Sequence, residues 1–135
     1  GLFAADSYLQ SGPPIGSTGD LIGRRFIGYI SDLIYAPELD YIQDIHPQIA
    51  TAIESSNLVA QLRATLAGAG LCILPAFIAR LHPELSPVLP DEIRLTRSLH
   101  VIAHEDMRGL ERIRIVSEFL AEEARASKDI LSLRR

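Results

Sequence analysis

The sequence predicts an α/β fold whose sheet is mixed or largely parallel. Segments with the composition of strands alternate with segments of helical periodicity, which is the pattern of α/β domains. Leu71–Leu74 is a continuous apolar run of strand length, typical of a strand covered on both faces. Just before it, apolar residues recur at helical spacing in Leu58–Ala67. With 135 residues, 47% of them hydrophobic and 22% charged, the chain is suited to one globular domain.

In the first half of the chain, turn-forming residues separate short apolar segments. Ser11-Gly-Pro-Pro14 ends the first helical turn, and Ser17-Thr-Gly-Asp20 matches a helix-capping pattern. Residues 31–47 carry two tyrosines and two prolines and favour a loop with one helical turn. The expected elements are a strand at Leu2–Ala5, a helical turn at Ser7–Gln10, a short helix from Ser17 to Gly23, and strands at Arg25–Ile30 and Gln48–Glu54.

Two helices dominate the second half. The first has its apolar residues at Leu58, Val59, Leu62 and Leu66, and Gly68 or Gly70 can end it in left-handed geometry. The second, Gly109–Ala126, has the apolar face Leu110, Ile113, Val116, Phe119 and Leu120. On its solvent side Arg114 can pair with Glu118, one turn away.

Shorter elements surround these helices. Pro75 can start a helix over Ala76–Leu81, because proline is tolerated in a first turn. Prolines also flank Ser86–Leu89 and predict an edge strand there. The remaining elements are a strand at Leu99–His104 and a frayed tail at 127–135.

Charge and cysteine content exclude several classes of protein. The formal net charge is −4 at pH 7, so the chain alone lacks the basic face that nucleic-acid binding requires. No segment reaches the roughly 18 apolar residues needed to cross a bilayer, and no signal peptide is visible. Cys72, the single cysteine, is expected to be a small buried residue, and it fits a reducing compartment.

The sequence has no recognisable catalytic or metal-binding pattern. His46 and His82 each precede a proline, while His100 and His104 lie too far apart on one predicted strand to share a metal. No Gly-x-Ser-x-Gly turn of a serine hydrolase is present. Gly68-Ala-Gly70 follows a helix, the reverse of the order in a dinucleotide-binding motif. We therefore expect a binding module without a cofactor, and not an enzyme.

The strongest functional signal is Ser55-Ser56-Asn57, between a predicted strand and a predicted helix. Unpaired N–H groups and a partial positive charge at a helix N-terminus suit a small anion. The alternative is that Ser56 or Asn57 only caps the helix, which contributes about 1 kcal/mol. The two roles are compatible, because a capping side chain leaves other N–H groups available.

A family resemblance rests on six segments, which are Leu2–Gly12, Asp20–Ile27, Glu54–Asn57, Ala67–Pro75, Leu99–His104 and Arg112–Leu120. In this order they resemble the effector-binding domain of LysR-type transcriptional regulators, specifically its C-terminal part. Each segment alone is a weak signal. Their occurrence in register over the chain up to Ala126 makes the resemblance specific.

The resemblance implies a periplasmic-binding-protein-like (type 2) fold, in which two α/β subdomains enclose an effector cleft and are joined by two crossover strands. Residues 1–97 would then hold the first crossover strand and the second subdomain. Residues 98–126 would return to the first subdomain as a strand and a helix, followed by a tail at 127–135. The DNA-binding winged helix-turn-helix and most of the first subdomain would lie outside this sequence.

The resemblance also implies partners and site residues. A small anionic metabolite, a carboxylate, would bind in the cleft and favour one arrangement of a cytoplasmic homo-oligomer. In the family the region of Leu58–Ala67 packs against the first subdomain of another protomer. The implied effector-facing residues are Ser55, Ser56 and Asn57 for the anion, Leu74, Pro75 and Phe77 for an apolar wall, and Ile27, Gly28 and Tyr29 at a neighbouring strand end. Core packing is the alternative for Leu74 and Phe77, and Asp6 and Ser7 would border the hinge.

Other functions stay open at this point. The same fold serves solute-binding proteins that feed transporters, although no signal peptide is visible here. An enzyme on this scaffold would need an acid–base pair in the cleft, and the sequence offers none. A third possibility is a structural oligomerisation module without a ligand. The regulator hypothesis rests on similarity of fold. A shared fold does not by itself establish a shared function, which depends on the residues of the site.

Overall fold

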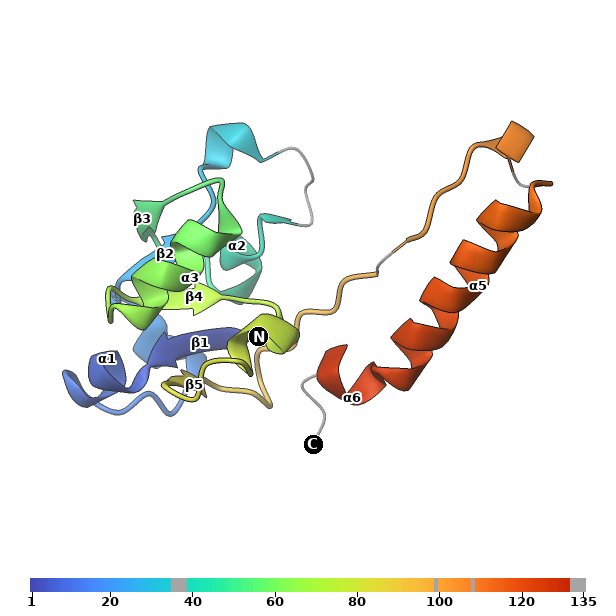
Figure 1. The fold of residues 1–135 in the computed structure, drawn as a ribbon. Helices are drawn as coiled ribbons and strands as arrows, with labels where there is room; N and C mark the ends of the chain where they lie inside the picture. The colour runs from blue at the N-terminus through green and yellow to red at the C-terminus, as the bar shows by residue number, and fades with distance from the viewer. Residues whose placement is uncertain (35–38, 99, 108, 132–135) are drawn as a thin grey trace. The chain divides into compact units, whose positions relative to one another are not determined.

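The computed structural model describes residues 1–34, 39–98, 100–107 and 109–131. The chain divides into two compact units, Gly1–Leu95 and Thr96–Arg135. The first unit contains a β-sheet with its helices, whereas the elements of the second are all helical (Figure 1). In the described part of the chain, no helix is both long enough and apolar enough to cross a membrane.

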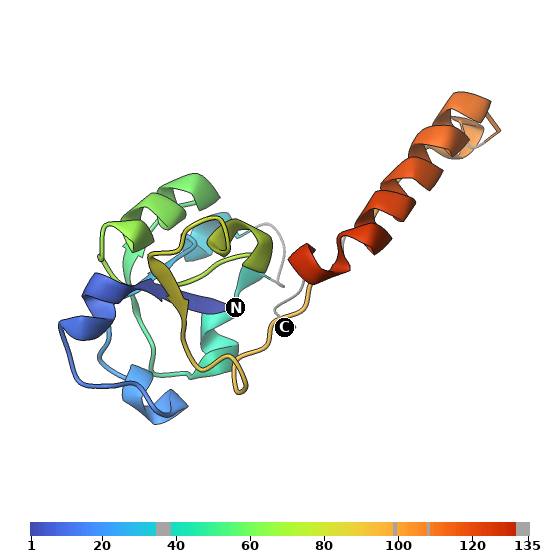
Figure 2. The ribbon, with the colours of Figure 1, turned by 60° about the horizontal axis from the view of Figure 1, so that its bottom comes forward.

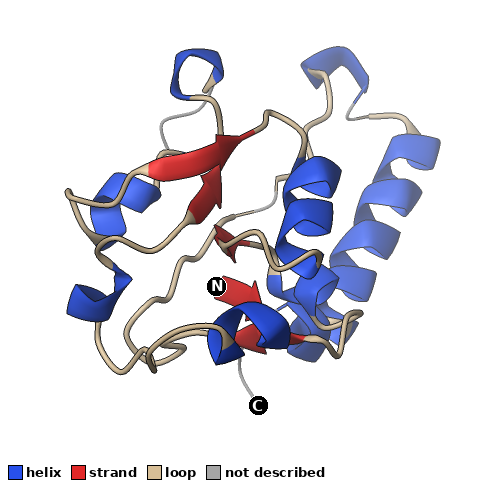
Figure 3. Cartoon of the chain, turned by 90° about the vertical axis from the view of Figure 1, so that its left-hand side faces the viewer, coloured by secondary structure: helices blue, strands red, loops and turns tan. Residues whose placement is uncertain are grey.

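A five-stranded mixed sheet forms the centre of the first unit (Figure 3). Its strands are β1 (Leu2–Ala5), β2 (Phe26–Gly28), β3 (Thr51–Glu54), β4 (Leu71–Ile73) and β5 (Leu85–Pro87). Their spatial order is β3-β2-β4-β1-β5. The first three of these are parallel, while β1 runs antiparallel to both β4 and β5. The prediction of a mixed or largely parallel sheet is confirmed.

The helices of the first unit are α1 (Asp6–Gln10), α2 (Ile42–Ile45), α3 (Leu58–Leu66) and α4 (Ala76–Ala79), with 3₁₀ turns at Thr18–Leu21 and Ser31–Leu33. α3 packs against β1, β2 and β4 (Figure 2). The segment 31–47, predicted to be a loop with one helical turn, has helical turns at Ser31–Leu33 and Ile42–Ile45, and residues 35–38 lie outside the described residues.

The core of the first unit is formed by side chains of the strands and of residues close to them in the sequence. Leu21, Phe26 and Leu71 are fully buried, and Leu2 is 1% exposed. All four residues of the run Leu71–Leu74 are buried, as expected for a strand covered on both faces. The buried run therefore marks the middle of the fold.

The buried face of α3 differs from the predicted one. Val59 is 62% exposed, whereas Gln61 is 1% exposed and Thr65 is fully buried. The predicted apolar face is therefore wrong at Val59. Residues two positions apart on a helix are separated by about 200°, so burying Gln61 turns Val59 outward. Gln61 is the inward residue because its amide finds acceptors at the strand ends.

Several element boundaries also differ from the predictions. The strand predicted over Gln48–Glu54 begins at Thr51, and the predicted edge strand Ser86–Leu89 lies at Leu85–Pro87. Residues 100–104 form no strand, and Leu99 lies outside the described residues, so the strand expected at Leu99–His104 is wrong. A strand needs a neighbouring strand for its backbone hydrogen bonds, and Thr96–Arg135 contains none among its described residues.

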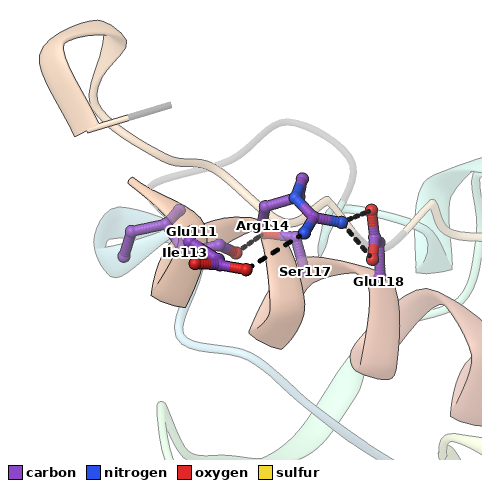
Figure 4. Close-up of polar contacts among 5 residues, drawn as sticks. All are labelled: Glu111, Ile113, Arg114, Ser117 and Glu118. Atoms are coloured by element: carbon purple, nitrogen blue, oxygen red, sulfur yellow. Dashed lines mark hydrogen bonds and ion pairs between the residues drawn. The ribbon is translucent and has the colours of Figure 1, made fainter. Parts of the chain in front are cut away.

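The second unit consists of a 3₁₀ turn at Glu105–Met107, the helix α5 (Glu111–Ala126) and the short helix α6 (Lys128–Leu131). α6 replaces the first part of the predicted frayed tail, and residues 132–135 lie outside the described residues. The predicted pair on α5 is present. Arg114 Nη1 donates to Glu118 Oε1 and Oε2 at 3.0 and 3.1 Å, and Arg114 Nη2 lies 3.7 Å from Glu111 Oε1 (Figure 4).

Candidate functional site

The carboxyl ends of three parallel strands meet at one edge of the sheet. Ile27 lies opposite both Ile53 of β3 and Cys72 of β4, so the three strands end side by side. The last residue of each strand and the residues after it, 28–30, 54–57 and 73–76, form what we call the carboxyl edge. In open α/β sheets, ligands bind outside the carboxyl ends of the strands. All nine expected effector-facing residues lie on or next to this edge.

The turn Ser55–Asn57 joins β3 to α3. Asn57 Oδ1 accepts the backbone N–H groups of Val59 at 2.8 Å and Ala60 at 3.2 Å, so Asn57 caps the helix. Ser55 Oγ in turn accepts the N–H of Asn57 at 3.1 Å. Ser56 is exposed, and within the described residues the N–H groups of Ser56 and Leu58 have no acceptor. Two amides at the start of α3 can therefore donate to a ligand.

Gln61 connects this turn to the neighbouring strand, and sequence reasoning missed it. Its Nε2 donates to the carbonyl oxygen of Ser55 at 2.6 Å and to that of Gly28 at 3.2 Å. The N–H of Ser55 also donates to the Gly28 carbonyl, at 3.0 Å. Gln61 and Thr65 lie four residues apart on α3, and this polar pair on one helix face was the available signal.

Beyond β2, the chain is closely packed around Gly28 and Tyr29. A Cβ on Gly28 would lie 2.7 Å from side-chain atoms of both Ile42 and Thr51, so only glycine fits there. Tyr29 is half-buried and packs edge-to-face against Tyr41, with ring centroids 6.3 Å apart. Ile27 is 1% exposed and lies inside the sheet.

After β4, the expected wall residues have different surroundings. Leu74 is 1% exposed, and its N–H donates to the carbonyl of Gly1 at 3.0 Å, so it belongs to the core. Pro75 is half-buried and precedes the first residue of α4. Phe77, in the first turn of α4, is 39% exposed. Core packing therefore describes Leu74, whereas Phe77 presents an apolar surface.

Asp6 and Ser7 lie apart from the carboxyl edge. They follow β1, which runs antiparallel to β4, so they are found at the opposite edge of the sheet. There Asp6 Oδ1 accepts the hydroxyl of Ser86 at 2.6 Å. The structure does not bring these two residues together with Ser55–Asn57.

The Cys72 thiol lies next to the carboxyl edge and is buried. Burial raises the pKa of the Cys72 thiol to about 12, so the sulfur stays protonated at neutral pH. Over the described ranges, no three His, Cys, Asp or Glu side chains are grouped in a way that could hold a metal ion. The chemistry available at this edge is hydrogen bonding and apolar contact.

A surface hollow of about 470 Å³ lies elsewhere on the first unit. It is lined by Leu9, residues 13–16 and residues 87–92. None of the expected effector-facing residues contributes to its wall. The hollow and the carboxyl edge are therefore separate features of this unit.

Comparison with known proteins supports the family resemblance. The sequence model described as the LysR substrate binding domain matches residues 1–125. No curated protein gives a significant match. Among solved structures, the chain is similar to the regulatory domain of CrgA, a LysR-type transcriptional regulator from Neisseria meningitidis, with a TM-score of 0.68 and 21% identity. The match covers 90% of this chain but 62% of that one, and at this identity it shows the fold alone.

Proposed function

The chain belongs to the LysR substrate binding domain family, and on this premise we propose that it is the effector-sensing part of a transcriptional regulator. The resemblance and the periplasmic-binding-protein-like α/β fold expected from it are both confirmed. The ligand, the partners and the regulatory role of the whole protein are parts of the proposal. We also propose that the chain is not an enzyme. The carboxyl edge is suited to binding a ligand and not to converting it.

The observation that carries the proposal is the turn Ser55–Asn57 at the start of α3. The Asn57 side chain already caps the helix, so the N–H groups of Ser56 and Leu58 are left for another acceptor. A carboxylate accepts strong hydrogen bonds from such amides, and the helix dipole favours its negative charge. We therefore propose a small anionic metabolite, a carboxylate, as the effector. Ser55, Ser56 and Asn57 would hold its anionic group.

The apolar part of the effector would lie against the other two strand ends. Of the expected wall residues there, Tyr29, Pro75 and Phe77 have accessible surface. Ile27 and Leu74 are buried, and they would shape this wall from within the sheet. The proposed effector thus combines one carboxylate with an apolar body.

The domain organisation is proposed on the same premise. Residues 1–97 would form the second subdomain with its crossover strand, and residues 98–126 would return to the first subdomain. α5 has no buried residue within its own unit, and Val116 and Phe119 on it are 55% and 58% exposed. This apolar surface suits a helix that packs against the rest of a first subdomain. The tail, 127–135, would follow.

We propose that the protein acts as a homo-oligomer. Val59, on the outer face of α3, is 62% exposed, and Ile53 of the edge strand β3 is 38% exposed. These apolar side chains suit packing against another protomer. DNA would be contacted only through a winged helix-turn-helix outside this chain, which implies a cytoplasmic location.

The test is Ser56→Ala in the intact protein, with Ser11→Ala as a matched control. Ser11 lies after α1, and its hydroxyl donates only to the Tyr8 carbonyl. A panel of carboxylate metabolites is titrated by calorimetry, and promoter binding is followed by fluorescence anisotropy. Losing the hydrogen bond from the Ser56 hydroxyl to the effector carboxylate should weaken the effector response about tenfold in Ser56→Ala, with the Ser56 N–H retained and basal DNA binding unchanged.

Each other outcome would change the proposal in a defined way. Unchanged effector affinity in Ser56→Ala would remove the Ser56 hydroxyl from the site. An equal loss in Ser11→Ala would point to a general destabilisation. Carboxylate binding without any response in DNA binding would instead favour a solute-binding module of the same fold.

A further inference from the structure

Gln61 is a buried side-chain amide between α3 and the sheet, on the same helix face as the buried Thr65. It is 1% exposed, and no buried side-chain nitrogen or oxygen among the described residues lacks a hydrogen-bond partner. Burying an amide is costly unless its donors and acceptor are all satisfied. Gln61 is therefore held in one orientation by its partners.

Those partners come from three neighbouring strands or the residues next to them. Nε2 donates to the carbonyl oxygen of Gly28, the last residue of β2, and to that of Ser55, which follows β3. Oε1 lies 3.7 Å from the Cys72 Sγ in β4, within the range of a thiol hydrogen bond. One side chain on α3 thus connects two segments of the carboxyl edge, at Gly28 and Ser55, and also contacts the middle of β4.

The bond to Ser55 has a geometric consequence for Ser56. The Ser55 carbonyl and the Ser56 N–H belong to the same peptide group, which is planar and trans, so they point in opposite directions. When Gln61 draws the carbonyl inward at 2.6 Å, the N–H of Ser56 is directed outward. Accepting a hydrogen bond at the oxygen also polarises the peptide, which makes its N–H a stronger donor.

We propose that Gln61 is a positioning residue for the effector site, and that it aims the Ser56 N–H at the anion by holding the Ser55 carbonyl. It does not touch the effector itself. The inference rests on the proposed function, in which the Ser56 N–H donates to the anion. It adds that Gln61, a buried residue of α3, determines the affinity for that anion.

The test compares two isosteric changes on α3 in the intact protein. Gln61→Leu removes the amide and keeps the volume. Thr65→Val removes another buried hydrogen bond, the one from Thr65 Oγ1 to the Gln61 backbone carbonyl at 2.8 Å, and leaves the amide in place. The probe is benzenesulfonate, which stays anionic at every pH used. Hydrogen exchange of the 54–58 segment is measured in parallel without any ligand.

Both variants should lower the melting temperature, but only Gln61→Leu should weaken benzenesulfonate binding, by about tenfold or more. Thr65→Val should bind it within about twofold of the unchanged protein. Faster exchange at 54–58 should likewise appear in Gln61→Leu alone. Equal affinities, or equal losses in the two variants, would overturn the proposal.

Gln61→Glu provides a second variant that keeps the side-chain shape. Once ionised, the new carboxyl group can only accept, so it repels the carbonyls of Gly28 and Ser55. Protonation restores one donor, so affinity for benzenesulfonate should rise as the pH falls, and more steeply than in the unchanged protein. An affinity for this variant that stays flat with pH would contradict the proposal.

If the unchanged protein binds no benzenesulfonate, the proposed anion site fails for this probe. The role of Gln61 is then decided by exchange alone. Selective loss of protection at 54–58 in Gln61→Leu supports the positioning role, and unchanged protection overturns it. The two failures are therefore distinguishable.

Discussion

The hydroxyl oxygen of Ser7 lies 3.0 Å from the point that a Cβ on Gly68 would occupy. Gly68 follows α3 with φ at +73°, in the left-handed region that favours glycine. The residue that ends α3 is therefore also the place where α1 approaches that helix. Gly68 is therefore needed both for its positive φ and for the close approach of the Ser7 side chain.

Gly68→Ala should lower the free energy of unfolding by about 1–2 kcal/mol from the backbone alone. The contact with Ser7 should add to this loss, which urea denaturation would measure. Gly23→Ala separates the two effects, because Gly23 has φ at +78° with nothing within 4 Å of its Cβ position. If both variants lose the same stability, the contact with Ser7 is energetically neutral.

Asn57→Ala should cost about 1 kcal/mol of unfolding free energy, because the N–H groups of Val59 and Ala60 lose their acceptor. Asn57→Ser should retain most of the stability, since serine also caps helices. Chemical denaturation of the two variants side by side checks this. A loss in the serine variant as large as that in the alanine variant would show that capping is not the role of Asn57.

Asp20 should make stability depend on pH. Its carboxylate accepts the N–H of Gly16 at 3.0 Å, and this bond, with bonds from the hydroxyl and N–H of Ser17, lowers the pKa of Asp20. The folded pKa lies below the unfolded one, so the stabilisation is present above the unfolded pKa. It is lost as the pH falls through the folded pKa. Asp20→Asn should remove this part of the acid dependence, as measured by melting temperatures between neutral and acidic pH. An identical pH profile in the variant would contradict the assignment.

Cys72 should be unreactive in the folded protein. It is fully buried, and its pKa is raised to about 12, so neither access nor a thiolate is available at neutral pH. Maleimide labelling followed by mass spectrometry should show slow modification in buffer and rapid modification in denaturant. Rapid labelling without denaturant would mean that β4 opens readily.

Local sequence rules predicted most of the elements of the first unit. The apolar run Leu71–Leu74 is buried, Asn57 caps α3, and Gly68 ends it, because each effect depends on a few adjacent residues. The strand expected at Leu99–His104 failed for the opposite reason. Its residues favour a strand, but a strand also needs a neighbour to pair with.

By itself the sequence determined the α/β class, the family and the position of Ser55–Asn57 before a helix. Capping residues, glycine geometry and apolar periodicity act over single turns and strands. Only the tertiary structure decided that Gln61 faces inward and Val59 outward. That choice depends on carbonyl acceptors 33 and 6 residues away in the sequence, at Gly28 and Ser55, which are brought to α3 only when the sheet has formed.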